Sequence, residues 1–339
     1  MNESWRNEAN ENAMSGSEMM MTELEQHMEP GFLDDFQIIL SRPRELLEDK
    51  IRIFYAHDLP DDPESVKALS NSGWSKFHKF VFVSNWQAQR YIERYNIPWS
   101  RTVVLRNAIN DIEVDIPKKF DFSKNEEIRM IYHTTPHRGL NLLIPVFEKL
   151  CEHVENVHLD VYSSFKLYGW EDRDSQFEPL YDRIEAHDNM TYHGSVDNET
   201  IRTALSKSHV FPYPCTWQET SCRSLIEAMA SGLMCIHPNY AALYETAGYW
   251  TFMYPYHEVA QDHAAHHFEM LHHACSMLRD PEATENIVMK LQGQASHAAV
   301  NYSWEVRKEE WKVFLNSCRN LPREFEGTTG EMFSYKVSG

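Results

Sequence analysis

The sequence is short of cations, and this deficit excludes one class of protein. Its 339 residues include 32 Lys and Arg against 51 Asp and Glu, which gives a formal net charge of −19 at pH 7. Neutralising phosphate requires a surplus of cations, so the surface as a whole is unsuited to binding nucleic acid or an anionic membrane. Nucleic acid is compatible only with a local basic face, for which the first domain offers Lys76, Lys79, Arg90, Arg94 and Arg101.

Long apolar runs and paired cysteines are also lacking. The run at residues 80–83 (FVFV) is far shorter than the ~18 residues that a spanning helix needs, so we expect no transmembrane segment. The first twenty residues are rich in charge and contain no apolar core of a secretory signal. The cysteines show no C-x-x-C spacing and are typical of reduced thiols in a cytoplasmic protein. They are Cys151, Cys215, Cys222, Cys235, Cys275 and Cys318.

The chain does contain short β-type segments that alternate with helical ones through both halves. Such alternation predicts parallel βαβ units, and a chain about twice the usual domain length predicts two α/β, doubly wound domains. The expected strands cover residues 51–57, 79–84, 101–106, 128–134, 157–163, 190–194, 210–213, 232–237 and 250–254. The expected helices cover residues 86–95, 140–151, 198–206, 222–230, 258–278 and 303–315.

A polar segment at residues 110–127, which contains Pro117 and has neither strand nor helix period, predicts the hinge between the domains. We therefore expect a first domain at residues 1–117 and a second at 118–302. An amphipathic helix within 303–321 and a tail at 322–339 follow.

Two glutamates eight residues apart provide the sharpest candidate site. Glu219 stands just before an expected helix that Thr220 or Ser221 can cap and that Gly232 ends. Glu227 lies two turns inside, so a rise of 1.5 Å per residue separates the two carboxyls by roughly 10–12 Å. Glycosidase carboxylates lie closer together, so this pair is better placed to hold the two ends of an extended ligand. Two solvated glutamates on an amphipathic helix are the alternative.

Arg138 is the second candidate. It follows a strand end and stands at the N-terminus of the next helix, where a cation opposes the helix dipole. Such a local conflict is typical of a functional site, and a bound phosphate would remove it. A solvated loop arginine is the alternative.

These segments resemble a known family. The Glu219-x7-Glu227 segment after the prolines at 212 and 214, together with Arg138-Gly139 opening a helix, is similar to GT-B glycosyltransferases of the group 1 (family 4) type. The resemblance implies two Rossmann-like domains facing across a cleft, with a C-terminal helix returning toward the first. It implies retaining transfer from a nucleotide-diphosphate sugar, with no metal ion and no cofactor beyond that donor. The first domain would hold the acceptor.

The resemblance also assigns roles in the second domain. Glu227 would hold the donor ribose and Glu219 the donor sugar, while Arg138 and the backbone near Thr220 and Ser221 would meet the diphosphate. The segment lying against the base would be Gly194, Ser195 and Val196. The family often has a second phosphate cation five or six residues before Arg138, where this chain has Tyr132 and His133. Donor binding is then weaker, relies on His133, or uses Lys166 or Arg223.

The first domain matches the family less well. Gly16 and Ser17 resemble the glycine loop before the family's first helix, although one glycine replaces the usual two and little chain precedes it. His57, at a strand end, resembles the histidine that reaches the transferred sugar. The catalytic residues would then be His57, Glu219 and Arg138.

Several alternatives remain open at this stage. The acceptor is a polysaccharide, a lipid-linked sugar, a protein or a modified DNA base. A GT-B nucleotide-sugar epimerase would need an acid–base pair in the first domain, where Glu18, His57 and Asp58 are the candidates. A non-catalytic nucleotide-sugar binder is the third possibility.

Two further features have ordinary structural explanations. The histidine-rich stretch at residues 257–273 has ligand-like spacing, but packing of a helix on the second domain is the favoured interpretation. The aromatic residues between 74 and 86 are predicted to be mostly core, with Trp74 or Trp99 as candidates for stacking on an acceptor.

Overall fold

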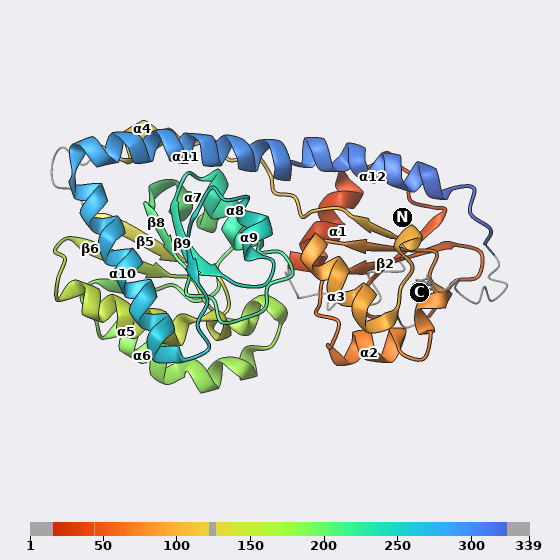
Figure 1. Cartoon of the computed structure of the whole chain (residues 1–339), viewed down its shortest axis with the longest axis horizontal. Helices are drawn as coiled ribbons and strands as arrows, with labels where there is room; N and C mark the ends of the chain where they lie inside the picture. Colours follow the sequence, from red (N-terminus) through yellow and green to blue (C-terminus); the bar gives the residue numbers. More distant parts are fainter. Residues whose placement is uncertain (1–15, 44, 122–126, 324–339) are drawn as a thin grey trace, which may run out of the picture. The chain divides into compact units, whose positions relative to one another are not determined.

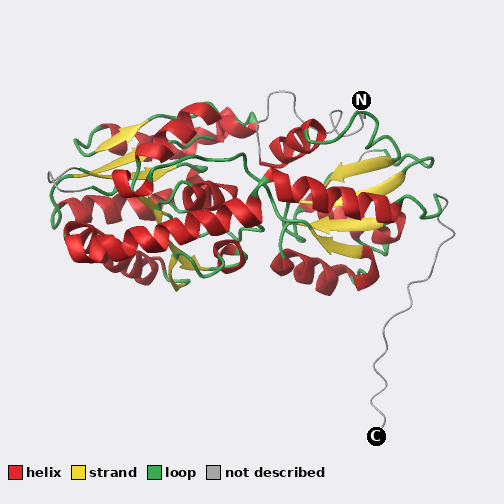
Figure 2. Cartoon of the chain, turned by 90° about the horizontal axis from the view of Figure 1, so that it is seen from above, coloured by secondary structure: helices red, strands yellow, loops and turns green. Residues whose placement is uncertain are grey.

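The computed structural model describes residues 16–43, 45–121 and 127–323. They form two α/β units, each built on a sheet of parallel strands (Figures 1 and 2). Among these residues, the first unit contains 17–107 and 307 onward, and the second contains 108–306 together with 16. The α/β class with two parallel sheets, expected from the sequence, is confirmed.

The first unit is built on a four-stranded parallel sheet. Its strands are β1 (Phe36–Leu40), β2 (Ile51–Ala56), β3 (Lys79–Phe82) and β4 (Thr102–Val104), hydrogen-bonded in that order. Every residue of β2 is buried, as expected for a central strand with both faces covered. The core beside β2 and β3 is aromatic and includes Trp74, Phe77, Phe80 and Phe82. Trp74 is only 7% exposed, so it is a core residue and cannot stack on an acceptor.

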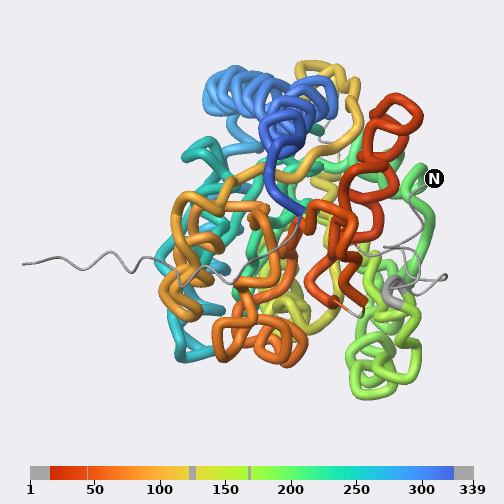
Figure 3. The backbone as a smooth tube through the Cα atoms, turned by 90° about the vertical axis from the view of Figure 1, so that its right-hand side faces the viewer, coloured from red at the N-terminus to blue at the C-terminus, as the bar shows by residue number. Residues whose placement is uncertain are grey.

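Helices α1 (Gly16–Gln26), α2 (Pro63–Leu69) and α3 (Asn85–Tyr95) belong to this unit, as does most of α12 (Trp304–Cys318). Trp311 of α12 is fully buried, and its ring meets that of Tyr55 edge-on at 5.1 Å. Beyond α12 the chain turns toward the strands of the first unit (Figure 3). There the ring of His78 bonds to the carbonyl of Pro322. The expected return of a C-terminal helix to the first unit is therefore observed.

The second unit has a six-stranded parallel sheet. Its strands are β5 (Ile128–Tyr132), β6 (Val157–Val161), β7 (Met190–Tyr192), β8 (Val210–Pro212), β9 (Met234–Asn239) and β10 (Phe252–Pro255). They are hydrogen-bonded in the order β10-β9-β8-β5-β6-β7. This is the strand order of a doubly wound nucleotide-binding sheet. The chain begins with the central strand β5, adds β6 and β7 on one side, and then crosses to add β8, β9 and β10 on the other side.

Helices cover both faces of this sheet (Figure 1). On one face α5 (Leu140–Cys151) packs against α10 (Ala260–Arg279), and α6 (Glu178–Glu185) packs on β7. On the other, α8 (Arg223–Ala230) packs against α11 (Pro281–Tyr302) and contacts β9. The remaining helices are α4 (Ile116–Lys119), α7 (Asn198–Lys207) and α9 (Leu243–Ala247). No helix in the described part of the chain is long and apolar enough to cross a membrane.

Residues 108–117, placed with the first domain by the sequence, pack with the second unit. The side chain of Ile116 packs directly on Gly232, which has a φ of +66° and where a Cβ would lie 2.5 Å from that side chain. The absence of a Cβ at Gly232 therefore allows this segment to lie against the second unit. Lys119 adds a polar contact, because its buried ammonium donates to the carbonyls of Leu205 and Ser231 at the ends of α7 and α8. The polar segment taken for a hinge thus contains a short helix docked on the second unit.

All nine strands expected from the sequence are present within a few residues, and so are the six expected helices. Strand β1, the long helix α11 and the shorter helices α1, α2, α4, α6 and α9 lie outside the expected elements. In α11 a glycine, Gly293, stands mid-helix because a Cβ would lie 2.6 Å from the ring of Trp250. The six cysteines are free thiols.

Candidate active site

The loops that follow β5 and β8 mark the point where the second sheet reverses its strand order. These two strands are neighbours, paired between Met130 and Val210, although two strands and three α-helices lie between them along the chain. Ligands of open parallel sheets bind beyond the carboxyl ends of the strands at such a reversal. Residues 133–139 and 213–222 are therefore the first place to expect a site, and both sequence candidates lie there.

Gly139 lets these two loops pack backbone against backbone. Its φ is +116°, and a Cβ on it would lie 2.2 Å from the carbonyl oxygen of Pro214. Only glycine tolerates both the conformation and the approach. The contact fixes Arg138, in the short 3-10 turn Pro136–Arg138, against the loop that leads into α8.

Arg138 and Glu219 form an ion pair at this contact. The Arg138 Nη1 lies 2.5 Å from the Glu219 Oε1, and the Tyr213 hydroxyl donates to the same oxygen at 2.6 Å. Glu219 is 4% exposed, so the carboxylate is buried and depends on these partners. The sequence predicts an anion beside Arg138, and in this structure the carboxylate of Glu219 supplies the negative charge.

The helix between the two glutamates begins later than expected. Cys222 occupies the N-cap position of α8 and makes no capping hydrogen bond through its side chain, so the expected cap by Thr220 or Ser221 is wrong. Both lie in the loop and are partly buried. The N-cap residue Cys222 thus offers no side-chain oxygen to the first N–H groups of α8, and a helix N-terminus favours an anion.

A second cluster surrounds Glu227. The Arg223 Nε lies 3.2 Å from the Glu227 Oε1, and the His133 Nε2 lies 3.9 Å from its Oε2. The hydroxyl of Ser224 donates to the carbonyl of His133, which ties the end of β5 to the first turn of α8. Glu227 therefore lies between a neutral ring and a guanidinium.

His133 carries no positive charge at neutral pH in this structure. Its side chain is 3% exposed, and neither ring nitrogen has a hydrogen-bond partner. Burial lowers the pKa of His133 to about 4, so the ring is neutral at pH 7. Arg223 is the cation placed beside Glu227, whereas Lys166 is exposed and pairs with Glu171.

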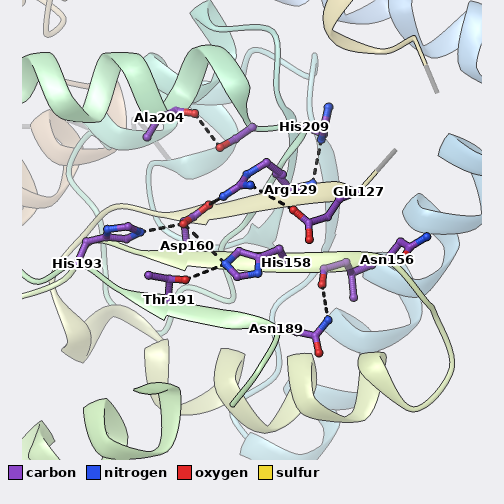
Figure 4. A network of polar contacts seen from close by, with 12 residues as sticks. Glu127, Arg129, Asn156, His158, Asp160, Asn189, Thr191, His193, Ala204 and His209 are labelled. Carbon is purple, nitrogen blue, oxygen red and sulfur yellow. Dashed lines mark hydrogen bonds and ion pairs between the residues drawn. The ribbon is translucent and has the colours of Figure 1, made fainter. Parts of the chain in front are cut away.

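The segment expected to lie against the base follows β7, at the same sheet edge. Gly194 has a φ of +65°, Ser195 is exposed and Val196 is partly buried. A polar network anchors the residue before them: Asp160 bonds to Arg129 and to His193, each at 2.8 Å (Figure 4). Burial opposes ionisation of Asp160, but the bonds from His193 and Arg129 hold its pKa below the usual value.

His57 lies at the carboxyl end of β2 in the first unit, as expected. Its backbone N–H donates to the hydroxyl of Ser41, and its ring meets that of Tyr55 at 4.2 Å. Burial lowers the pKa of His57 to about 3, so the ring is neutral and can exchange hydrogen bonds with sugar hydroxyls.

Two carboxylates lie near His57 in the same unit. Asp58 forms an ion pair with Arg42 at 3.9 Å, and both act on Glu18 in the first turn of α1. Burial raises the pKa of Glu18 and of Asp58, and Arg42 partly offsets the rise. Close carboxyls with raised pKa values are typical of acid–base sites.

The glycine loop lies mostly outside the described residues, which begin at Gly16. Gly16 is the exposed first residue of α1, followed by the partly buried Ser17. A Cβ on Gly16 would meet no atom within 4 Å, so the structure gives no steric reason for glycine there.

The histidine-rich stretch forms α10 and uses its rings in packing. Its buried members His263 and His267 both contact the hydroxyl of Tyr254 on β10. No group of three metal-binding side chains with suitable geometry occurs in the described residues. The proposed basic face is also engaged locally, since Arg101 donates to the carbonyl of Phe77 and lies over the ring of Trp74.

Comparison with known proteins assigns the second unit. Residues 111–251, which contain the switch-point loops and both glutamates, match the family model described as glycosyl transferases group 1. This segment of the second unit is similar to the group 1 glycosyltransferases. Comparison with curated proteins finds no match to the chain.

Solved structures place the chain in the GT-B fold. A glycosyltransferase from Rickettsia africae matches with a TM-score of 0.62 at 15% identity, over 91% of this chain and 82% of that one. Anabaena HepE, solved with UDP-glucose, matches with 0.61 at 13% identity, over 88% and 82%. Sucrose-phosphate synthase from Thermosynechococcus elongatus matches with 0.58 at 14% identity, over 88% and 78%.

Two residues of the site escaped the sequence analysis. Tyr213 ends the β8 segment and bonds to Glu219, yet in sequence it is one more aromatic of a buried strand. Trp217, two residues before Glu219, is 44% exposed. The signal available in the sequence was a tryptophan two residues before the first glutamate of the motif.

Proposed function

We propose that this glycosyltransferase is a retaining, metal-independent enzyme that moves a sugar from a nucleotide-diphosphate sugar to an acceptor hydroxyl. The observation that carries the proposal is the geometry around the N-terminus of α8. There the Arg138–Glu219 pair and the Arg223–Glu227 pair flank a helix end without a side-chain cap, at the switch point of a nucleotide-binding sheet.

The diphosphate would lie at the N-terminus of α8. Backbone N–H groups and the helix dipole favour an anion there, and Arg138 and Arg223 supply two positive charges without a metal ion. A guanidinium has five N–H donors, so Arg138 can hold Glu219 through Nη1 and turn others toward a phosphate. In this proposal Arg223 takes the place of the family's second phosphate cation.

Glu227 would accept hydrogen bonds from the ribose hydroxyls. Its two oxygens currently meet Arg223 and the neutral ring of His133, both of which can remain while a hydroxyl donates. The neutral His133 can donate to a phosphate or ribose oxygen without adding charge. Anabaena HepE, which is similar in fold to this chain, has been solved in complex with UDP-glucose and with UDP and glucose, and this supports a donor of this class.

Transfer would occur on one face of the donor sugar. The bond from C1 to the diphosphate oxygen breaks while the acceptor oxygen bonds to C1 from the same side, and the acceptor proton passes to the leaving phosphate. Arg138, Arg223 and the helix end stabilise the charge that grows on the diphosphate. Glu219 and His57 position the sugar and do not exchange protons with it.

The direct test is turnover with and without acceptor. UDP-, GDP-, ADP- and TDP-sugars are incubated with candidate acceptors, and nucleotide release and product anomer are read by NMR. We expect nucleotide release that depends on the acceptor, and a product with the donor's anomeric configuration. An inverted product would overturn the retaining mechanism.

The epimerase alternative is favoured by one observation, the proximity of Glu18 and Asp58 with raised pKa values. An epimerase would convert the donor without any acceptor and would lose activity in Asp58→Asn. The non-catalytic alternative predicts donor binding with neither conversion nor transfer.

A further inference from the structure

A buried serine with a strained backbone lies directly after β1 in the first unit. Ser41 has a φ of +59° and is 2% exposed. Of the seven non-glycine residues with a positive φ in the described part of the chain, Ser41 is the one that is buried. Strain of this kind persists only where the surroundings fix it, and it is concentrated at functional sites. Ser41 is therefore a candidate for a role beyond the fold.

The Ser41 hydroxyl contacts both residues that follow β2. Beyond the last paired residues of β1 and β2, the His57 N–H donates to the Ser41 Oγ at 3.0 Å. The same side chain forms a hydrogen bond with the side chain of Asp58. Because an ionised carboxylate only accepts, Ser41 donates its proton to Asp58 while it accepts from His57. Glycine adopts a positive φ without cost but has no hydroxyl, so these two bonds account for the serine.

Helix α3 fixes the backbone of the same segment. The carbonyl of Asp58 accepts from the Gln87 side-chain amide at 3.0 Å and from the Tyr91 hydroxyl at 3.1 Å. Both Gln87 and Tyr91 are fully buried, so water does not compete for these bonds. The backbone that carries the His57 ring and the Asp58 carboxyl is therefore held both by Ser41 and by α3.

Charged groups from three other segments act on the Asp58 carboxyl. Arg42, directly after Ser41, lies 3.9 Å from it, Asp62 is the N-cap of α2, and Glu18 lies in the first turn of α1. Burial raises the pKa of Asp58 and Asp62 adds to the rise, whereas Arg42 and the Ser41 hydroxyl hold it down. The Ser41 bond thus favours the ionised form of a carboxyl whose surroundings favour the neutral form.

We infer that Ser41 is a positioning residue of the proposed transferase, whose hydroxyl fixes the Asp58 carboxylate and the His57 backbone so that the two side chains together bind hydroxyls of the sugar. A carboxylate and a neutral imidazole supply acceptors and a donor for neighbouring sugar hydroxyls. Both follow the carboxyl end of β2, where parallel sheets bind ligands, and the Asp58 side chain is 32% exposed. The inference rests on the proposed function and adds Asp58 and Ser41 to its machinery.

The test compares Ser41→Gly and Ser41→Ala with wild type in the full chain. Both variants lack the hydroxyl, but only glycine accommodates the positive φ, so thermal unfolding should rank Ser41→Ala below Ser41→Gly. Ser72→Gly is the matched control, because Ser72 has a φ of +63° in the same unit, is exposed, and makes no capping hydrogen bond through its side chain. A loss of activity shared by both Ser41 variants is then separate from their difference in stability.

Transfer is measured with the nucleotide-sugar and acceptor that wild type turns over. We expect kcat about tenfold lower in Ser41→Gly and in Ser41→Ala, and unchanged in Ser72→Gly. Donor affinity should stay as in wild type, because the proposed nucleotide site lies in the second unit. The acid limb of the kcat profile should move to higher pH, since loss of the Ser41 bond raises the pKa of Asp58. In an Asp58→Asn background, Ser41→Gly should reduce kcat little further.

Carboxyl-carbon NMR of Asp58, assigned by the signal missing in Asp58→Asn, tests the contact without any substrate. The titration should move to higher pH in Ser41→Gly and stay in place in Ser72→Gly. An unmoved titration, a kcat of Ser41→Gly within about twofold of wild type, or effects that add fully with Asp58→Asn would each overturn the inference. A wild type that turns over no nucleotide-sugar would overturn the transferase proposal, and with it the role of Ser41 in transfer, even where the titration moves.

Discussion

Substitutions that break the Arg138–Glu219 pair should destabilise the second unit, and the effects of the two single substitutions should not add up to the effect of the double substitution. In Arg138→Met the carboxylate of Glu219 stays buried with Tyr213 as its remaining named partner. Removing one member of a buried ion pair costs about 3–5 kcal/mol. Because the Arg138 side chain is 20% exposed, we expect the lower end, about 3 kcal/mol.

The reciprocal change should cost less. In Glu219→Gln the amide oxygen can still accept from Arg138 and Tyr213, and the loss is the difference between charged and neutral hydrogen bonds, about 1 kcal/mol. The double variant leaves no buried charge, so we expect about 2 kcal/mol and a coupling of about 2 kcal/mol.

Hydrogen-exchange labelling across a urea series measures this within the second unit alone. Peptides covering β5 and β8 report its unfolding, while peptides from β2 and β3 serve as the internal control. The reasoning is refuted by an Arg138→Met variant within 1 kcal/mol of wild type, or by effects that add within 0.5 kcal/mol.

Three further predictions concern the stability of the second unit. Gly139→Ala should lower the free energy of unfolding by at least about 2 kcal/mol, because Gly139 has a positive φ and lies against the carbonyl of Pro214. Gly16→Ala, where a Cβ meets no atom, should leave it unchanged, and equal thermal stability of the two variants would contradict this. Burial lowers the pKa of Lys119 from 10.5 in the unfolded chain to about 7 in the folded one. Between these two pH values the unfolded chain binds one proton more than the folded chain at this side chain. The free energy of unfolding should therefore rise with pH in this window, by about 1.4 kcal/mol per pH unit. Lys119→Met should remove that rise in urea unfolding, and an unchanged pH slope would count against the buried ammonium. Burial also holds five histidines of the second unit neutral. Below pH 6.5 the unfolded chain therefore protonates first, and stability falls toward pH 4; a urea midpoint equal at pH 7 and pH 5 would exclude this. The five are His133, His137, His209, His237 and His267, with pKa values of about 3 to 4.

Much of the fold could be predicted because the strands of both sheets are short, apolar and evenly separated by helices. Strand β1 was not predicted because it has only five residues and no helix lies between it and β2. Helix α11 escaped because its buried residues include the polar Thr284 and Gln294, and it is interrupted by Gly293. Contacts with Trp250 and α8, invisible in sequence, stabilise it.

The sequence predicted which residues belong to the candidate site, but not which of them contact one another. The sequence placed Arg138 and Glu219 eighty-one positions apart, with no sign that they pair. That contact depends on Gly139 meeting Pro214, which follows from the strand order. The neutrality of His133 likewise depends on burial beneath α8, which no local pattern reveals.

The most direct test of the account is calorimetric titration of UDP-, GDP-, ADP- and TDP-sugars into wild type, Glu227→Gln and the exposed control Glu269→Gln. The account predicts that at least one nucleotide-sugar binds wild type and Glu269→Gln alike, and binds Glu227→Gln at least about tenfold more weakly. Binding by none of them to wild type, or equal binding by Glu227→Gln, would contradict it.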